Sequence, residues 1–112
     1  MFRFRLQQVL DLREKQERHL ATQLAAAMGA ERAAKDALNG LRAEREAGAE
    51  GVQDGQAHSV GELANLAFIM QQLDDRIAGA NDVVSAANES VSQVKEALTS
   101  AFKDRRVLDR LR

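Results

Sequence analysis

Several residue types that usually build compact folds are absent from this 112-residue chain or scarce in it. Without proline, no position has to interrupt a helix. Without cysteine, disulfides and thiolate metal ligands are excluded. Four phenylalanines are the only aromatic residues, and no apolar run approaches the roughly 18 residues of a membrane-spanning helix. With 29% charged residues and many Ala, Leu, Glu, Arg and Gln, the composition is typical of long helices.

Residues that could carry chemistry are also few. Neither of the two histidines, His19 and His58, stands in a metal-binding spacing, and we expect both to be solvated. The glycines are not followed by the Gly-Lys-Ser or Gly-Lys-Thr of a phosphate-binding loop. A rod of helices offers no concave pocket that could shift carboxylate pKa values. We therefore predict no catalytic residues, no metal site and no cofactor, and a protein that is not an enzyme.

The second half of the chain carries a long heptad repeat. Apolar residues recur there at alternating spacings of three and four, and thirteen of the fifteen repeat positions are apolar. Such a repeat excludes strands and predicts a coiled-coil helix that needs a partner along its length. The repeat positions are Leu63, Leu66, Met70, Leu73, Ile77, Ala80, Val84, Ala87, Val91, Val94, Leu98, Ala101, Arg105, Leu108 and Arg112.

The first half carries a weaker version of the same repeat. Eight of its twelve positions are apolar, and Gly29 and Gly40 between them each cost a helix about 1 kcal/mol relative to Ala. The repeat positions are Leu6, Leu10, Arg13, Glu17, Leu20, Leu24, Ala27, Glu31, Ala34, Leu38, Leu41 and Arg45.

Residues 48–59 interrupt the pattern with several glycines and read as a loop. Ser59, followed three residues later by Glu62, predicts a capping box at the start of the second helix. The sequence thus predicts a single coiled-coil domain over residues 1–112, with a helix at about 3–47, a loop at about 48–59 and a helix at about 60–112.

Two helices of similar length joined by a short loop predict an all-α fold, an antiparallel two-helix coiled-coil hairpin in the form of a long rod. A turn centred near residue 53 would place Arg45 near Glu62 and Glu31 near Arg76, as ion pairs that help to fix the register. Arg13 and Glu17, although on the repeat, have no evident partners in this arrangement. A parallel dimer or a higher assembly through the second helix is the alternative.

Charge is unevenly distributed, although the formal net charge is only -1. Residues 1–13 and 103–112 are basic, and residues 44–62 are acidic. The hairpin brings the two basic segments together at one end, which we name the open end. Acids at the start of the second helix and bases at its end also suit the helix dipole. The sharper interpretation is that the open end docks in an acidic cavity of a partner.

Some large apolar residues lie off the repeat. We expect Phe2 and Phe4 to reach Phe102 and Leu108 and so to close the open end with an apolar cluster. Phe68 and its neighbour Ile69 face away from the other helix. They are covered by the loop or by another copy of the chain, or they are exposed as a partner contact.

The opening FRFRLQQVLDLREKQE and the end AFKDRRVLDRLR, on either side of a glycine-broken middle, resemble the FliJ family, the small coiled-coil component of the flagellar type III export apparatus. The resemblance covers essentially the whole chain. Members usually continue beyond such an end, so we expect a shortened form or a short member. The most specific matches are Phe2, Phe4, Arg5, Leu6, Val9, Leu10, Leu12, Arg13 and Glu14.

The resemblance implies a cytoplasmic rod at the inner membrane of the flagellar base, similar to the shaft of rotary ATPases and active in flagellum biogenesis, motility and protein transport. Its expected partners are the hexameric flagellar export ATPase, the cytoplasmic domain of the export gate and export chaperones, with no nucleic acid and no membrane insertion. The expected ATPase-ring contacts are Arg3, Arg5, Arg13, Arg105, Arg106, Arg110 and Arg112. The expected export-gate contacts are Phe68, Ile69, Leu73, Arg76 and Ala80. The alternative is a self-associating structural coiled-coil scaffold.

Overall fold

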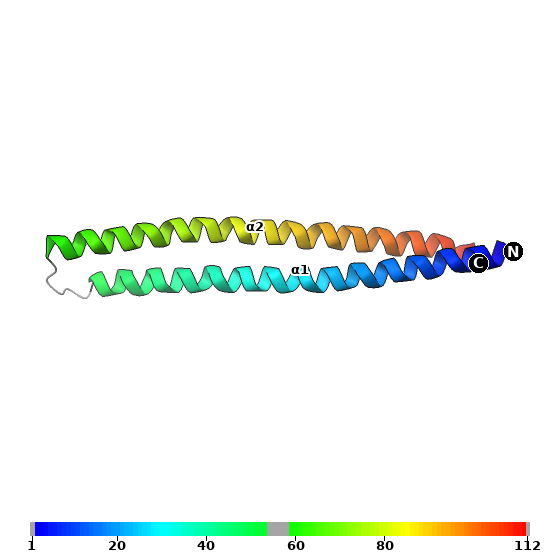
Figure 1. Cartoon of the computed structure of the whole chain (residues 1–112), viewed down its shortest axis with the longest axis horizontal. Helices are drawn as coiled ribbons and strands as arrows, with labels where there is room; N and C mark the ends of the chain where they lie inside the picture. Colours follow the sequence, from blue (N-terminus) through cyan, green and yellow to red (C-terminus); the bar gives the residue numbers. More distant parts are fainter. Residues whose placement is uncertain (1, 54–58, 112) are drawn as a thin grey trace. The chain divides into compact units, whose positions relative to one another are not determined.

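The computed structural model describes residues 2–53 and 59–111, and within these ranges two helices and no strand are present. Helix α1 spans Phe2–Gln53 and helix α2 spans Val60–Arg110 (Figure 1). The chain divides into two units, one formed by Met1–Glu31 with Ala87–Arg112 and the other by Arg32–Ala86. In each unit a segment of α1 lies antiparallel beside a segment of α2. The fold is all-α, an antiparallel two-helix coiled-coil hairpin, as the heptad repeat predicted.

The predicted repeat is the face on which the two helices meet. All twelve repeat positions of α1 are buried or half-buried, and so are the thirteen positions of α2 from Leu66 to Leu108. At the start of α2, Leu63 is 47% exposed. Because only two helices meet, no large side chain of the described residues is fully enclosed. The most buried apolar side chains are Leu6, Leu10, Leu38, Leu73, Val91 and Ala101.

The start of α2 is fixed by the predicted cap. The backbone N–H of Glu62 donates to the hydroxyl oxygen of Ser59 at 3.1 Å. The N–H of Leu63 donates to the carbonyl oxygen of the same serine at 3.0 Å. Ser59 is therefore the N-cap, and α2 begins at Val60 as expected.

The end of α1 lies beyond its expected position near residue 47, since the helix continues to Gln53. Gly48 lies on the inner side of α1, where a Cβ atom would come within 3.2 Å of the Met70 Sδ atom. The glycine therefore makes room for Met70 instead of ending the helix. Packing of this kind outweighs the propensity cost of about 1 kcal/mol for a glycine in a helix.

The register of the hairpin differs from the expectation. Arg45 binds both carboxylate oxygens of Asp74, not Glu62, and Asp74 lies about three helical turns further along α2. In the same unit, Arg42 Nη2 donates to Asn81 Oδ1 at 3.4 Å. Among the described residues, no ion pair involves Arg76. The expectation failed because a periodic apolar face tolerates sliding, and because α1 is longer than the sequence indicated.

In the unit that holds the chain ends, the register is set by two further ion pairs. Arg105 Nε donates to Glu17 Oε1 at 2.7 Å, and Arg13 Nη1 lies 3.8 Å from Asp104 Oδ2. The side chain of Glu17 is only 12% exposed, so a displaced register would leave a largely desolvated carboxylate without its partner. These pairs account for the two charged repeat positions that the sequence left unexplained.

Candidate functional site

The open end is formed by residues 2–13 of α1 and residues 103–111 at the end of α2, all within one unit of the chain (Figure 1). It carries seven basic side chains and three aspartates. Six of the seven arginines expected to contact an ATPase ring gather here, and the seventh, Arg112, lies outside the described residues. The predicted basic end is therefore present, but its arginines have different roles.

Two of the six arginines hold the helices together. Arg13 lies 3.8 Å from Asp104 on the other helix and donates to Gln16 at 3.3 Å. Arg105 binds Glu17 across the helices and lies 3.4 Å from Asp109 on its own helix. The hydrogen bond to Glu17 and its negative charge raise the pKa of Arg105 above its ordinary value. These side chains are already engaged within the hairpin.

The other four arginines, Arg3, Arg5, Arg106 and Arg110, are exposed. Within the part of the chain that the structure describes, none of them forms a hydrogen bond or an ion pair through its side chain. A guanidinium group has five donors in a planar fork and stays charged at all physiological pH values. These four arginines and the exposed Lys103 are the basic side chains of the open end that no described residue pairs.

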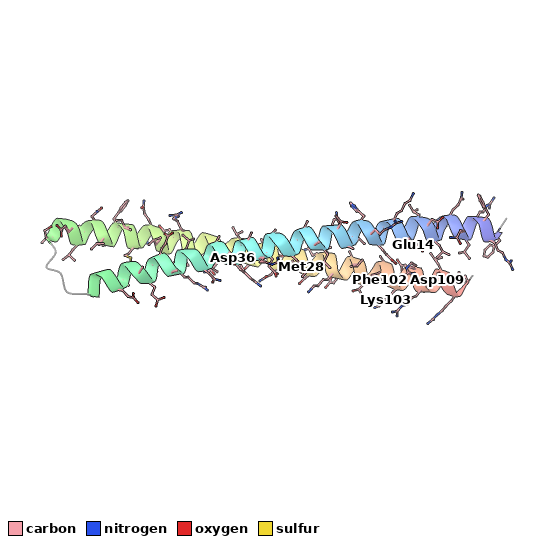
Figure 2. All side chains as sticks on the ribbon, turned by 90° about the horizontal axis from the view of Figure 1, so that it is seen from below. Glu14, Met28, Asp36, Phe102, Lys103 and Asp109 are labelled. Atoms are coloured by element: carbon pink, nitrogen blue, oxygen red, sulfur yellow. The ribbon has the colours of Figure 1, made fainter. Side chains whose placement is uncertain are left out.

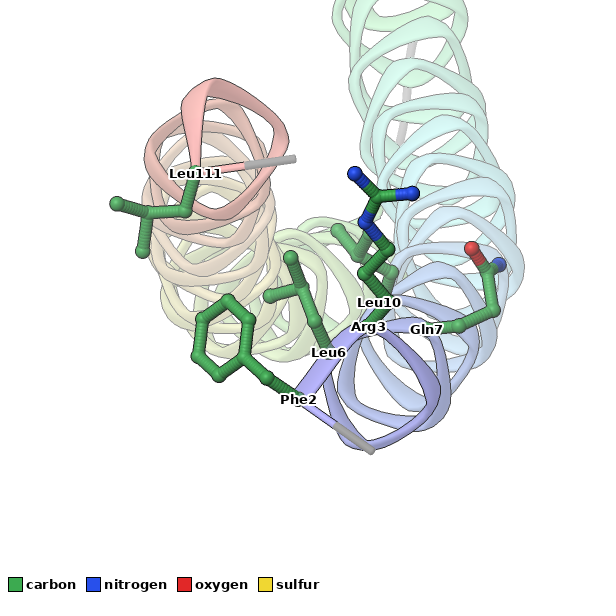
Figure 3. A pocket seen from close by; sticks show the side chains of 6 residues that line it. All are labelled: Phe2, Arg3, Leu6, Gln7, Leu10 and Leu111. Atoms are coloured by element: carbon green, nitrogen blue, oxygen red, sulfur yellow. The ribbon is translucent and has the colours of Figure 1, made fainter.

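The predicted apolar closure of the open end is wrong. Phe2 and Phe4 are 70% and 69% exposed, and Phe102, labelled in Figure 2, is 42% exposed. The register explains this result, because it moves the first turn of α1 away from Phe102 and toward the last residues of α2. Phe2 lies by Leu111 instead (Figure 3).

Phe2 and Leu111 flank a cavity of about 600 Å³ (Figure 3). Its deepest lining residues are Leu6 and Leu10, which are 9% and 2% exposed, and Arg3 with Gln7 completes the lining. The sequence did not predict this cavity, since it assigned the first phenylalanine to the core. The available signal was Arg13 and Glu17, two charged repeat positions of α1 that pair with Asp104 and Arg105 in the observed register.

A second exposed surface lies near the start of α2. Phe68 and Ile69 are 60% and 43% exposed, so they face outward as the repeat predicted. Arg76 is also exposed, whereas Leu73 is 8% exposed and Ala80 is half-buried, both toward α1. The five residues expected to contact the export gate are therefore divided between an outward face and the contact between the helices.

Features that would indicate metal chemistry are missing from residues 2–53 and 59–111, where no group of three metal-ligating side chains occurs. His19 is exposed, as expected, and lines a shallow depression with Arg13, Gln16 and Asp104. His58 lies outside the described residues. No described helix is long and apolar enough to cross a membrane.

The sequence matches the model of a known protein family. A family model described as Flagellar FliJ protein matches residues 1–112, which is the whole chain. No curated protein and no solved structure matches the chain.

Proposed function

The chain belongs to the FliJ family of flagellar proteins, and from that membership and the geometry of its two exposed surfaces we propose that it is a non-enzymatic stalk and adaptor. As a family member it is a component of the flagellar export apparatus and associates with other components of that apparatus. In the proposal it works in the cytoplasm, peripheral to the inner membrane at the flagellar base. Its open end docks in the hexameric export ATPase.

The observation that carries this proposal is the set of four unpaired arginines on the open end. Arg3 and Arg5 come from α1, and Arg106 and Arg110 come from α2, so one end of the hairpin presents cations on both helices. Unpaired exposed cations attract an acidic partner surface and speed association at low salt. Arg13 and Arg105 contribute indirectly, since their ion pairs hold the two helices in the register that forms the end.

The test is stimulation and binding of the purified export ATPase by a variant with Arg106→Ala and Arg110→Ala. Each exposed cation typically contributes modestly, so we expect a loss of roughly tenfold in affinity at low salt, and a smaller loss at high salt. The matched control, Arg18→Ala with Arg32→Ala, removes the same charge from exposed positions of α1 outside the open end. Equal losses in both variants would count against docking by the open end.

The second proposed contact joins the outward face near the start of α2 to the cytoplasmic domain of the export gate. Phe68 and Ile69 supply exposed apolar area, and Arg76 supplies a charge that no described carboxylate neutralises. Leu73 and Ala80 pack against α1 and hold this part of α2 in place. Export chaperones are also proposed to bind this chain, and no surface of the chain is assigned to them.

The gate contact is tested by binding of the purified gate domain to Phe68→Ala. A side chain that is 60% exposed contributes little to stability, so the variant should stay folded and lose affinity. Val83→Ala is the matched control, since Val83 lies on the same helix and is 58% exposed. An equal effect of the two substitutions would show that general apolar area, and not this surface, controls binding.

Self-association as a structural scaffold is the second candidate, because thirteen large apolar side chains of the described residues remain exposed. Such side chains can pack against another copy of the chain. Sedimentation equilibrium at micromolar concentrations separates the two functions. A stable monomer would remove the scaffold from consideration.

A further inference from the structure

The cavity of the open end has an apolar base and two exposed apolar side chains at its edges. It lies where α1 begins and α2 ends, with the nearly buried Leu6 and Leu10 at its base (Figure 3). Phe2 and Leu111, 70% and 60% exposed, stand on either side. An apolar floor between two exposed apolar walls leaves room for a side chain from outside the hairpin.

One charged side chain lines this cavity. Arg3 lines the cavity and makes no ion pair or hydrogen bond through its side chain within the described residues. Gln7, the other polar lining residue, donates to Asp11 at 3.0 Å on the same helix. The cation is therefore the lining group that remains available to an incoming carboxylate.

We propose that the cavity binds an acidic amphipathic helix of a partner protein, with an apolar side chain of that helix between Phe2 and Leu111 and a neighbouring carboxylate on Arg3. The inference deepens the proposed docking of the open end by assigning the chemistry of the docking segment. A helix suits the site because the groove between two packed helices accepts side-chain ridges of a third helix. Its apolar and acidic faces match the apolar floor and the unpaired arginine.

Two other occupants fit the observations less well. A second copy that met this one open end to open end would place seven basic side chains and three aspartates against the same set, and the two ends would repel each other. An anionic lipid surface would take up every exposed aromatic side chain of the end. Phe4 is as exposed as Phe2 but does not line the cavity, so this residue separates insertion into a cavity from contact with a flat surface.

The experiment measures binding of a fluorescent synthetic helical peptide of about twenty residues, with a Leu and Phe stripe flanked by Glu. A second peptide with Lys in place of every Glu is the charge control. We expect a micromolar Kd for the acidic peptide with the whole chain and no measurable binding of the basic one. Phe2→Ala and Arg3→Glu should each weaken binding by about tenfold or more.

The chain supplies a matched control for each variant. Phe4→Ala and Arg18→Glu change the same residue types at exposed positions that do not line the cavity, and each should change peptide affinity by less than about threefold. Failure of the acidic peptide to bind below about 1 mM would overturn the proposal. Equal losses from the Phe2 and Phe4 variants would do so too, as would anionic vesicles that bind with equal dependence on both residues.

Binding of the same variants to the purified export ATPase separates this inference from the proposed function. If the ATPase still binds Phe2→Ala and Arg3→Glu normally but loses affinity for the variant without Arg106 and Arg110, docking by the open end stands and the cavity is not its contact. If none of these variants affects ATPase binding while the acidic peptide still needs Phe2, the cavity stands and docking in the ATPase does not.

Discussion

Replacing three glycines in the middle of the helices by alanine should raise the free energy of unfolding by an amount that follows from the structure. Gly29, Gly40 and Gly79 each lie inside a helix, and a Cβ atom added at any of them would meet nothing within 4 Å. Replacing a glycine by alanine in a helix interior stabilises it by about 1 kcal/mol, because alanine loses less backbone entropy on folding. At these positions no steric cost reduces the gain.

The combined effect should be nearly the sum of the separate effects. A Cβ atom added at any of the three positions meets nothing within 4 Å, so the substitutions share no contact and should act independently. The triple alanine variant should therefore gain about 3 kcal/mol in unfolding free energy, which corresponds to an increase of roughly 13 °C in Tm for a chain of 112 residues. Thermal and urea unfolding followed by circular dichroism at 222 nm measure both quantities.

Gly48→Ala is the informative control. It removes the same propensity cost, but its Cβ atom would lie 3.2 Å from the Met70 Sδ atom, so the flexible methionine has to shift. We expect a clearly smaller gain than at Gly29. A gain equal to that of Gly29→Ala would show that Met70 does not pack against this glycine, and no gain at the three open positions would refute the assignment of continuous helix there.

Three further predictions concern the cap and the ion pairs. Ser59→Ala should cost about 1 kcal/mol in urea unfolding, because the Glu62 N–H loses its acceptor, and Ser59→Asp should restore most of it. Glu17→Arg should lower the Tm and Arg105→Glu should restore it in the double variant; failure of the rescue would contradict the observed register. Arg45, mainly through its hydrogen bond, lowers the pKa of Asp74, so this pair stabilises the fold above about pH 4 and its contribution is lost as the pH falls through the lowered pKa. Unfolding midpoints measured from pH 7 to pH 2 should therefore fall less steeply for Asp74→Asn than for the natural chain, and parallel curves would disprove the linkage.

The inner face of each helix could be predicted from sequence because it depends only on spacing within one helix. The capping box at Ser59 was predictable for the same reason, since its hydrogen bond joins residues three positions apart. The register of the two helices could not be predicted in this way, because apolar repeats on both helices allow many alignments that bury similar apolar area. It is selected by charges far apart in sequence, such as Glu17 and Arg105, and by the packing of Met70 at Gly48.

The arrangement of side chains at the open end depends on this register. Its basic character could be predicted from the distribution of charged residues along the chain. Which of its arginines are paired within the hairpin could not be predicted, because the pairing depends on which α2 residue faces Arg13. The same error placed Phe2 in an apolar cluster, whereas it stands at the edge of a cavity beside Leu111.

The cross-helix ion pairs also restrict how the length of such a chain can change during evolution. A deletion of seven residues between Glu17 and Arg45 would leave every apolar repeat position of α1 in phase. It would nevertheless displace one of the pairs Glu17–Arg105 and Arg45–Asp74 by about two turns. Only a matching deletion between Asp74 and Arg105 would bring both pairs back. Insertions and deletions in relatives that keep these pairs should therefore occur as correlated events, one in each helix and of equal length.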